Sequence, residues 1–203
     1  MQRAIPPDQP ERVLVPESGT GQREAVGDLH LAADNFAGAV EAFELALSAA
    51  DANDAPLRVR LLLKIAEAEF QRGAREAALK AAWLARAESR VLEDSRVRAT
   101  IASRLASIAF ENSNYRRSLR YARYAYAVLR DTNEHRTVGN VALTLGNNMQ
   151  RLGQPHAAIE WFQNAAATFR RIAHADGLVV ALNNLGMLYH EMNRPDEAVA
   201  SVR

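Results

Sequence analysis

Small apolar residues recur along the chain with a spacing of about forty positions. Gly27, Ala66, Ala106, Gly146 and Gly186 each follow a branched apolar residue, and successive members of this series lie 39 or 40 residues apart. A second small residue stands about twelve positions after each of them. These second positions are Ala39, Ala78, Ser118, Ala158 and Ala198. Because the two series stay in phase over most of the chain, the pattern indicates one structural unit repeated five times.

Each unit predicts two antiparallel helices joined by a tight turn. Small side chains on both helices let the helix axes approach to the short end of the usual ~8–10 Å range. Turn-forming residues lie between the two helices: Asp34 and Asn35, Gly73, Ser113 and Asn114, Gly153, and Asn193. Glycine or asparagine there can take the left-handed conformation in which many helices end. We expect ten helices, at residues 20–33, 36–52, 56–72, 75–92, 95–112, 115–131, 134–152, 155–173, 176–192 and 195–203.

The helices also carry short motifs. Residues 39–46 (AVEAFELA) and 158–165 (AIEWFQNA) match the pattern A-x-x-x-F-x-x-A, and residues 181–189 (ALNNLGMLY) contain Leu-Gly followed by a tyrosine. In these motifs the chain resembles tetratricopeptide repeat (TPR) proteins over residues 20–203. The resemblance implies an all-α fold, a right-handed α-solenoid of about five antiparallel helix hairpins. It also implies that the first helix of each hairpin lines a concave face.

Two features depart from the usual TPR pattern. The period is near 40 residues, whereas ~34 is usual, and in this length the chain is similar to kinesin light chain, cell-polarity scaffolds and sensor domains of large bacterial regulators. Ala82 and Ala122 stand where an aromatic residue is usual. We expect Trp83, Tyr121 or Phe70 to fill the space that these alanines leave.

The organisation along the chain follows from the repeats and from the prolines. Pro6, Pro7, Pro10 and Pro16 prevent a regular helix, so residues 1–19 are expected to form a flexible leader. The solenoid is expected at 20–203, with repeats at about 20–58, 59–98, 99–138, 139–178 and a truncated 179–203. Because a solenoid needs a polar capping helix, we expect the chain to be part of a longer protein. The uncapped end is also a candidate surface for self-association.

Composition and motifs exclude several function classes. Lys and Arg number 25 against 24 Asp and Glu, a net charge of +1 that gives no bulk attraction to nucleic acid or membranes. Cysteine is absent, and no phosphate-binding loop, HExxH or GxSxG motif is present. The five histidines are scattered over different hairpins. We therefore expect no enzyme, no metal and no cofactor, and a cytoplasmic protein without a membrane span.

The concave face is the best candidate for function, because the resemblance implies that first-helix side chains face it. The candidate partner-binding residues are Ser107, Phe110, Asn140, Asn147, Gln150, Arg151, Asn183, Asn184, Met187 and His190. Glu24, Asp28, Arg60, Glu67 and Phe70 occupy related positions. Asparagine can pair with the backbone of an extended peptide. The alternatives are that these amides are solvated or join adjacent helices, and that Phe70 and Phe110 fill the core.

A basic strip lies at residues 114–130. Arg116, Arg117, Arg120 and Arg123 alternate there with tyrosines, a composition that can bind single-stranded nucleic acid. The strip belongs to a second helix, whose outward face is normally solvated, and so we expect no nucleic-acid partner. The leading hypothesis is a non-enzymatic module that binds a peptide or a segment of a partner protein. The alternative is a regulatory or sensory TPR segment of a larger bacterial signalling or transcription-regulating protein, with an effector domain beyond residue 203.

Overall fold

The computed structural model describes residues 19–194 and 196–197, and within this part the chain forms nine α-helices and no strand. Eight helices pair as four hairpins, and the ninth begins a fifth hairpin. They are α1 (Thr20–Ala32), α2 (Phe36–Ala49), α3 (Ala55–Gln71), α4 (Arg75–Glu88), α5 (Ser95–Glu111), α6 (Tyr115–Leu129), α7 (His135–Arg151), α8 (Pro155–Arg171) and α9 (Ala175–Glu191). A short 3-10 helix, η1 (Ser89–Val91), follows α4. The fold is an all-α solenoid.

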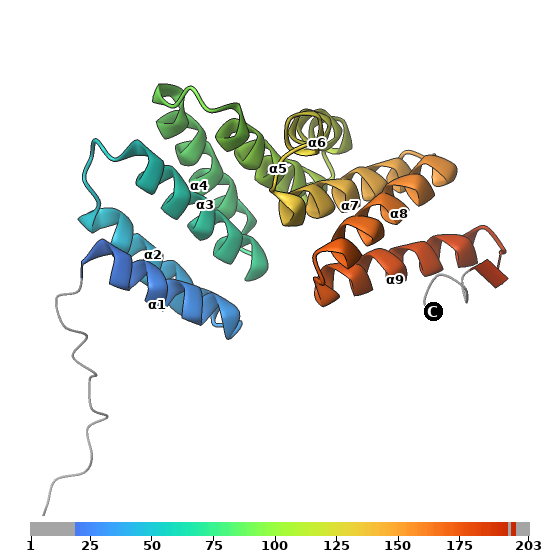
Figure 1. The fold of residues 1–203 in the computed structure, drawn as a ribbon, viewed down its shortest axis with the longest axis horizontal. Coiled ribbons are helices and arrows are strands. Elements are labelled where there is room, and N and C mark those ends of the chain that lie inside the picture. The colour runs from blue at the N-terminus through green and yellow to red at the C-terminus, as the bar shows by residue number, and fades with distance from the viewer. Residues whose placement is uncertain (1–18, 195, 198–203) are drawn as a thin grey trace, which may run out of the picture.

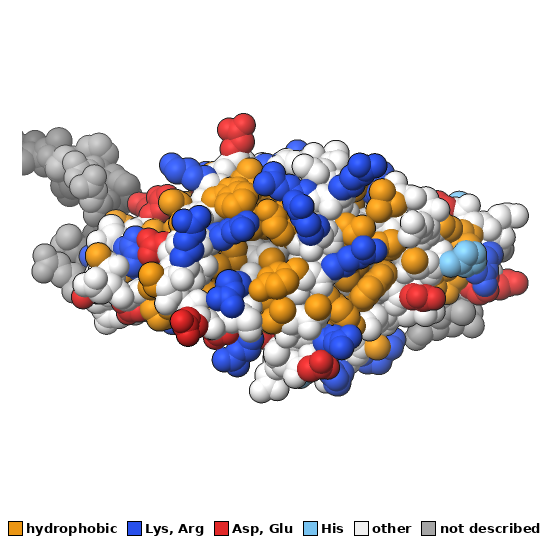
Figure 2. Space-filling model, turned by 90° about the horizontal axis from the view of Figure 1, so that it is seen from above, with side chains coloured by type: hydrophobic (Ala, Val, Ile, Leu, Met, Phe, Trp, Pro, Cys, Tyr) orange, Lys and Arg blue, Asp and Glu red, His pale blue; other side chains and the backbone are white. Residues whose placement is uncertain are grey.

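The hairpins follow one another along an arch. In Figure 1 α1 and α9 lie at the two ends of the arch, and α6 lies at its top. Figure 2 looks onto this upper face, where Lys and Arg side chains alternate with hydrophobic ones and acidic side chains are few near the centre. The arch therefore has an outer face of mixed basic and apolar character.

The turns lie where the sequence predicts them. Five residues with positive φ repeat the forty-residue spacing: Asp34 (54°), Gly73 (81°), Ser113 (57°), Gly153 (71°) and Asn193 (56°). Each of these ends the first helix of a hairpin. The predicted helix bounds are confirmed within about four residues for the first nine helices. The leader expected at residues 1–19 and most of the tenth helix lie outside the described residues.

Asparagine and aspartate side chains fix the beginnings of several helices. The Oδ1 atom of Asn35 accepts a hydrogen bond from the backbone N–H of Gly38, and that of Asn114 accepts one from Arg117. Asp54 and Asp94 cap α3 and α5 in the same way. Such caps satisfy N–H groups that have no partner inside the helix, so each hairpin starts at a defined residue.

The core is built from matched pairs of residues sixteen positions apart. Gly27 and Gly146 face phenylalanine rings, and a Cβ atom placed on either would lie 2.5 Å from Cδ1 of Phe43 or Phe162 respectively. In the two middle hairpins both partners are alanines, and all four of these alanines are fully buried. They are Ala66 with Ala82, and Ala106 with Ala122. A large side chain on one helix is therefore matched by glycine on the other.

The alanines at the usual aromatic positions are compensated in part as expected. Phe70 and Tyr121 pack against the core around Ala82, and Tyr121 also packs beside Ala122. Trp83 does not fill this space: it is 36% exposed. Its side chain lies on the outer face because the neighbouring Ala82, one residue earlier on α4, occupies the inward position.

A polar group is buried between the third and fourth hairpins. The Nδ2 atom of Asn148 donates to Ser118 Oγ at 2.8 Å and to the Thr144 carbonyl at 2.7 Å. Ser118 Oγ in turn donates to the Ala106 carbonyl at 2.8 Å. Asn148 and Ser118 are both fully buried. The chain of hydrogen bonds joins α5, α6 and α7, and so it fixes how the two hairpins stack.

Candidate functional site

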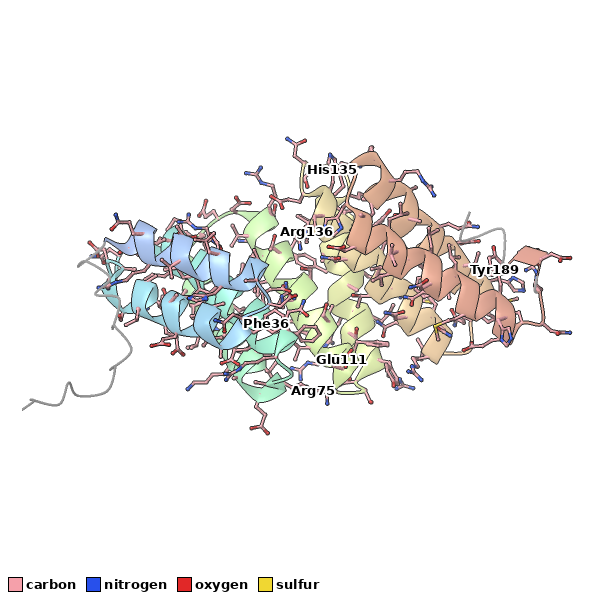
Figure 3. All side chains as sticks on the ribbon, turned by 90° about the horizontal axis from the view of Figure 1, so that it is seen from below. Phe36, Arg75, Glu111, His135, Arg136 and Tyr189 are labelled. Carbon is pink, nitrogen blue, oxygen red and sulfur yellow. The ribbon has the colours of Figure 1, made fainter. Side chains whose placement is uncertain are left out.

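Two adjoining hollows lie on the side of the arch that the odd-numbered helices line. One, of about 470 Å³, is lined by α3, α5, α7 and the beginning of α9. The other, of about 610 Å³, is lined mainly by α3 and α5. They share Leu63, Glu67, Thr100 and Arg104, so we treat them as one concave groove. Figure 3 looks onto this side, with Arg136 between the two halves of the arch.

The lining positions of the groove repeat with the period of the sequence. Helices α3, α5 and α7 each contribute one residue to each of four rows. The rows are Arg60, Thr100 and Asn140; Leu63, Ser103 and Leu143; Lys64, Arg104 and Thr144; and Glu67, Ser107 and Asn147. Along three of these rows the side chain changes from charged on α3 to amide or hydroxyl on α7. The groove is therefore ionic at its α3 end and rich in neutral hydrogen-bonding groups at its α7 end.

The structure places four of the predicted partner-binding residues in this groove: Ser107, Phe110, Asn140 and Asn147. The other six lie on the last part of α7 and on α9, outside the two hollows. They are Gln150, Arg151, Asn183, Asn184, Met187 and His190. Met187 is 61% exposed, and Arg151, Asn183 and His190 are exposed too. The predicted set thus divides into a groove group and a group near the carboxyl-terminal end of the arch.

Three of the predicted amides join adjacent first helices. Asn184 Nδ2 donates a hydrogen bond to Asn147 Oδ1 at 3.2 Å, which links α9 to α7. Gln150 Nε2 likewise donates to Glu191 Oε2 at 2.9 Å. These contacts match the alternative in which the amides tie helices together. In contrast, the side chain of Asn140 is exposed and forms no hydrogen bond with another described residue.

The two phenylalanines that recur at one repeat interval both line the groove. Phe70 and Phe110 are half-buried. The Phe110 ring packs against Tyr115 with 5.4 Å between ring centroids, and the Arg104 guanidinium lies 6.0 Å from the Phe70 centroid. Each ring therefore both supports the helix packing and offers apolar surface to the groove, so the core-filling role and the binding role are compatible.

Three arginines that line the groove, Arg96, Arg104 and Arg136, were not among the predicted site residues. Arg104 pairs with Glu67. Burial lowers the pKa of Arg104 to about 10, and the positive charge of Arg136 acts in the same direction, but Arg104 remains protonated at neutral pH. Arg136 is exposed and forms no ion pair with a described residue. Arg104 stands forty residues after Lys64, so the two residues occupy the same position in successive repeats.

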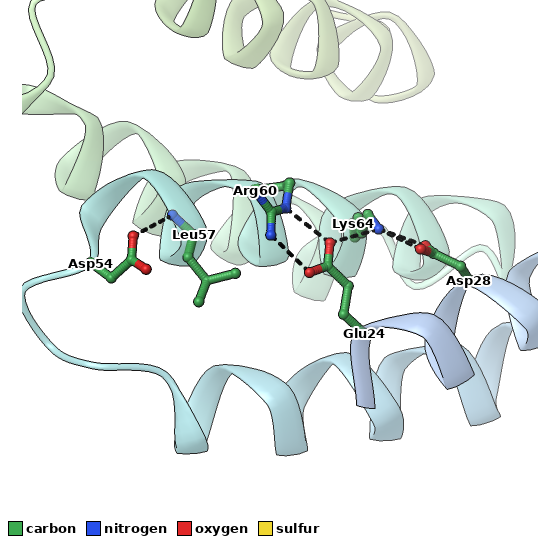
Figure 4. A network of polar contacts seen from close by, with 6 residues as sticks. All are labelled: Glu24, Asp28, Asp54, Leu57, Arg60 and Lys64. Carbon is green, nitrogen blue, oxygen red and sulfur yellow. Dashed lines mark hydrogen bonds and ion pairs between the residues drawn. The ribbon is translucent and has the colours of Figure 1, made fainter. Parts of the chain in front are cut away.

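At the α1 end of the groove the charges neutralise one another (Figure 4). The Arg60 guanidinium donates two hydrogen bonds of 2.9 Å to the Glu24 carboxylate. The Lys64 ammonium lies 2.8 Å from Glu24 Oε1 and 2.7 Å from Asp28 Oδ1. The hydrogen bond from Arg60 and the Lys64 contact lower the pKa of Glu24 to about 2. This network joins α1 to α3, so the predicted groove positions Glu24, Asp28 and Arg60 are engaged in structural ion pairs.

Comparison with known proteins supports what the repeat pattern predicts. The family model described as "Tetratricopeptide repeat" matches residues 137–203, and the hairpins before it repeat the same spacing and fold. Residues 137–203 are tetratricopeptide repeats. The repeats of the chain are of the long-period type, near 40 residues. No curated protein sequence matches this TPR chain.

Solved structures share the TPR fold. A Rap protein in complex with Competence and Sporulation Factor superposes with a TM-score of 0.78 at 19% identity, over 90% of this chain and 51% of that one. A putative kinesin light chain with TPR-like repeats from Podosopora anserina gives 0.66 at 16% identity, over 90% of both chains. A signal transduction ATPase with a tetratricopeptide repeat sensor from Pyrococcus horikoshii gives 0.72 at 14% identity, over 90% of this chain and 28% of that one. These likenesses concern the fold.

Within its described part, the TPR protein shows no group of three or more His, Asp or Glu side chains arranged to hold a metal ion. His174 has a structural contact: its Nδ1 atom accepts a hydrogen bond from the Gly177 N–H at 2.9 Å, at the beginning of α9. No helix among the described residues is both long enough and apolar enough to cross a membrane.

Proposed function

We propose that this TPR protein is a non-enzymatic interaction module that holds an extended segment of a partner polypeptide in the concave groove. The observation that carries the proposal is the combination of side chains at the α5–α7 part of the groove. Arg136 and Asn140 are exposed there and form no side-chain hydrogen bond with other described residues. Phe70 and Phe110 line the same hollow, nearer the carboxyl-terminal ends of α3 and α5.

These groups suit an extended polypeptide. The Asn140 amide both donates and accepts hydrogen bonds, so it can pair with a peptide backbone, and the Arg136 guanidinium can donate to a carbonyl or carboxylate oxygen. The half-buried rings of Phe70 and Phe110 offer apolar surface for a bulky side chain of the segment. Aromatic and arginine residues of this kind contribute most to binding in many interfaces.

The proposal is tested with a peptide selected on the purified protein from a random displayed library. We expect the double variant Arg136→Ala, Asn140→Ala to bind the selected peptide at least about tenfold more weakly, because one well-formed contact is worth roughly 1.4 kcal/mol or more. Both side chains are exposed, so the variant should keep its fold; far-ultraviolet circular dichroism checks this.

A matched control is the double variant Arg151→Ala, Asn183→Ala. It makes the same chemical changes at exposed positions outside the groove. We expect it to change the affinity by less than about twofold. If the control variant loses affinity and the groove variant keeps it, the segment binds at the carboxyl-terminal end of the arch and the groove assignment is wrong.

A second candidate function is a regulatory or sensory segment of a larger bacterial signalling or transcription-regulating protein. It is favoured by the likeness to the Pyrococcus horikoshii protein, in which a stretch of comparable fold is one part of a much longer chain. The reading frame downstream of residue 203 tests it. An effector domain in the same frame supports this function, and a stop codon directly after Arg203 contradicts it.

A further inference from the structure

A second recess lies on the outer face of the arch, away from the concave groove. Two adjoining hollows of about 550 and 520 Å³ open there between α4, η1, α5 and α6. In Figure 1 α6 is seen nearly end on at the top of the arch, whereas α4 lies across the view. Because the two outer helices diverge in this way, the surface between them is not closed by helix packing. We call this recess the arginine basin, after Arg86, Arg90, Arg98, Arg117 and Arg120, which line it.

The charge of the basin is positive and unbalanced. No Asp or Glu lines either hollow, and none of the five arginines forms an ion pair with a described residue. Glu88, which lies between Arg86 and Arg90 in the sequence, is engaged elsewhere. Arg58 of α3 donates to its carboxylate at 2.8 and 3.0 Å. On a chain whose net charge is +1, this local excess calls for an anionic partner.

The floor of the basin is apolar. Ile101 and Leu105 of α5 line the hollow from below and are each only 2% exposed. Tyr121 is half-buried and lines both hollows. A small inorganic anion would use only the arginines, whereas this floor also suits a bulky aliphatic or aromatic side chain. The partner should therefore carry both acidic and apolar groups.

Two of the three aromatic rings that line the basin, Trp83 and Tyr121, favour a polypeptide over a nucleic acid, whereas the third, Tyr124, is 42% exposed. Single-stranded nucleic acids bind largely by stacking their bases on exposed ring faces. Here the ring face of Trp83 is occupied, because the Arg86 and Arg117 guanidinium groups lie 5.0 and 5.7 Å from its centroid. Arg117 is also 6.0 Å from the Tyr121 centroid. The rings thus hold the guanidinium groups in place, and planar guanidinium groups bind carboxylates in a bidentate manner.

We infer that the arginine basin binds an acidic segment of a partner protein, in which Asp or Glu residues flank a bulky apolar side chain. The carboxylates pair with Arg86, Arg90, Arg117 and Arg120, and the apolar side chain rests on Ile101 and Leu105. This site is separate from the concave groove, because the two share no lining residue.

The test uses a fluorescently labelled peptide with two acidic residues on each side of a Leu-Phe pair. A second peptide has every acid replaced by its amide, and a third probe is a single-stranded oligothymidine of matched charge. We expect saturable binding of the acidic peptide at low salt, with an affinity at least about tenfold higher than for either other probe, and a marked loss at high salt.

Substitutions on α6 test where the acidic peptide binds. Arg117→Gln with Arg120→Gln removes two basin charges, and we expect at least a tenfold loss of affinity for the acidic peptide. The matched control, Arg116→Gln with Arg123→Gln, removes two exposed charges of the same helix that do not line the basin. It should change the affinity less than about twofold. The groove variant Arg136→Ala, Asn140→Ala should leave this binding unchanged, so failure here is distinguishable from failure of the proposed function.

Several results would overturn the inference. One is that the acidic peptide shows no saturable binding. Another is that the basin variant and its matched control lose affinity for this peptide equally. A third is that the oligothymidine binds more tightly than the acidic peptide. Equal affinity for the amide-substituted peptide would also contradict it, because the carboxylates would then have no role.

Discussion

Replacing Gly146 by alanine should destabilise the wild-type protein but stabilise a variant in which Phe162 is also alanine. In the wild-type protein the new Cβ atom would lie 2.5 Å from Cδ1 of Phe162, a fully buried ring. Such a contact is well inside van der Waals distance, so the ring or a helix must move. When Phe162 is also alanine, the pair becomes the Ala–Ala pair that the protein already uses at Ala106 and Ala122. The added methyl group then has room.

The magnitudes follow from known core substitutions. Overpacking of a close-packed core costs about 1–3 kcal/mol, so Gly146→Ala should destabilise the wild type by roughly that amount. Phe162→Ala should cost about 3–5 kcal/mol through the cavity that it leaves. In that background Gly146→Ala should stabilise by up to about 1 kcal/mol, because alanine is favoured over glycine within a helix. The coupling between the two sites is then about 1–4 kcal/mol.

The assay is urea unfolding of the wild type, both single variants and the double variant, followed by far-ultraviolet circular dichroism. The free energies are compared only if the dependence on urea is the same in all four proteins. Gly21→Ala is the control, because an added Cβ at this helical glycine meets nothing within 4 Å. It should be neutral or stabilise by up to about 1 kcal/mol. If Gly146→Ala lowered the free energy of unfolding by a similar amount with and without the Phe162 ring, the glycine would not be needed to make room for that ring.

Two further predictions concern polar groups. Because the pKa of Glu24 is lowered from 4.5 to about 2, chiefly by the Arg60 hydrogen bond, its stabilising contribution is complete above pH 4.5 and is lost as the pH falls towards 2. Between these pH values the wild type should lose about 2 kcal/mol more unfolding free energy than Glu24→Gln, measured by urea unfolding at each pH; parallel losses would contradict the pKa assignment. Ser118→Ala should cost about 1–3 kcal/mol, since it deprives the buried Asn148 amide of an acceptor. Ser48→Ala, at an exposed hydroxyl, should stay within about 0.5 kcal/mol in the same measurement, and equal losses would show that the buried hydrogen bond adds nothing.

Much of the fold could be predicted from the sequence because the determinants are local. A turn-forming residue adopts a positive φ just after the first helix of each hairpin, at Asp34, Gly73, Ser113, Gly153 and Asn193. The buried small residues set which helix faces meet. These features repeat with a fixed spacing, so a single sequence supports the same prediction of a helix hairpin five times.

The candidate site was predicted only in part. Phe110, Asn140 and Asn147 line the groove as expected, but the hydrogen bond between Asn147 and Asn184 depends on how adjacent hairpins stack. The distance between the Asn147 and Asn184 side chains therefore cannot be predicted from the sequence pattern.

The arginine basin could not be predicted as a recess. The sequence showed the arginines of α6 as one basic strip, whereas the structure separates Arg117 and Arg120, which line the recess, from Arg116 and Arg123, which do not. The recess exists because α4 and α6 diverge, and that divergence is a property of the stacked hairpins.

The most direct test of the central proposal is a crystal structure of the protein with a peptide selected on it. We predict that the peptide lies extended along α5 and α7 in the concave groove, in contact with Arg136 and Asn140 and beside the rings of Phe70 and Phe110. A peptide bound only to the outer helices α2, α4, α6 or α8, with the groove empty, would contradict the proposal.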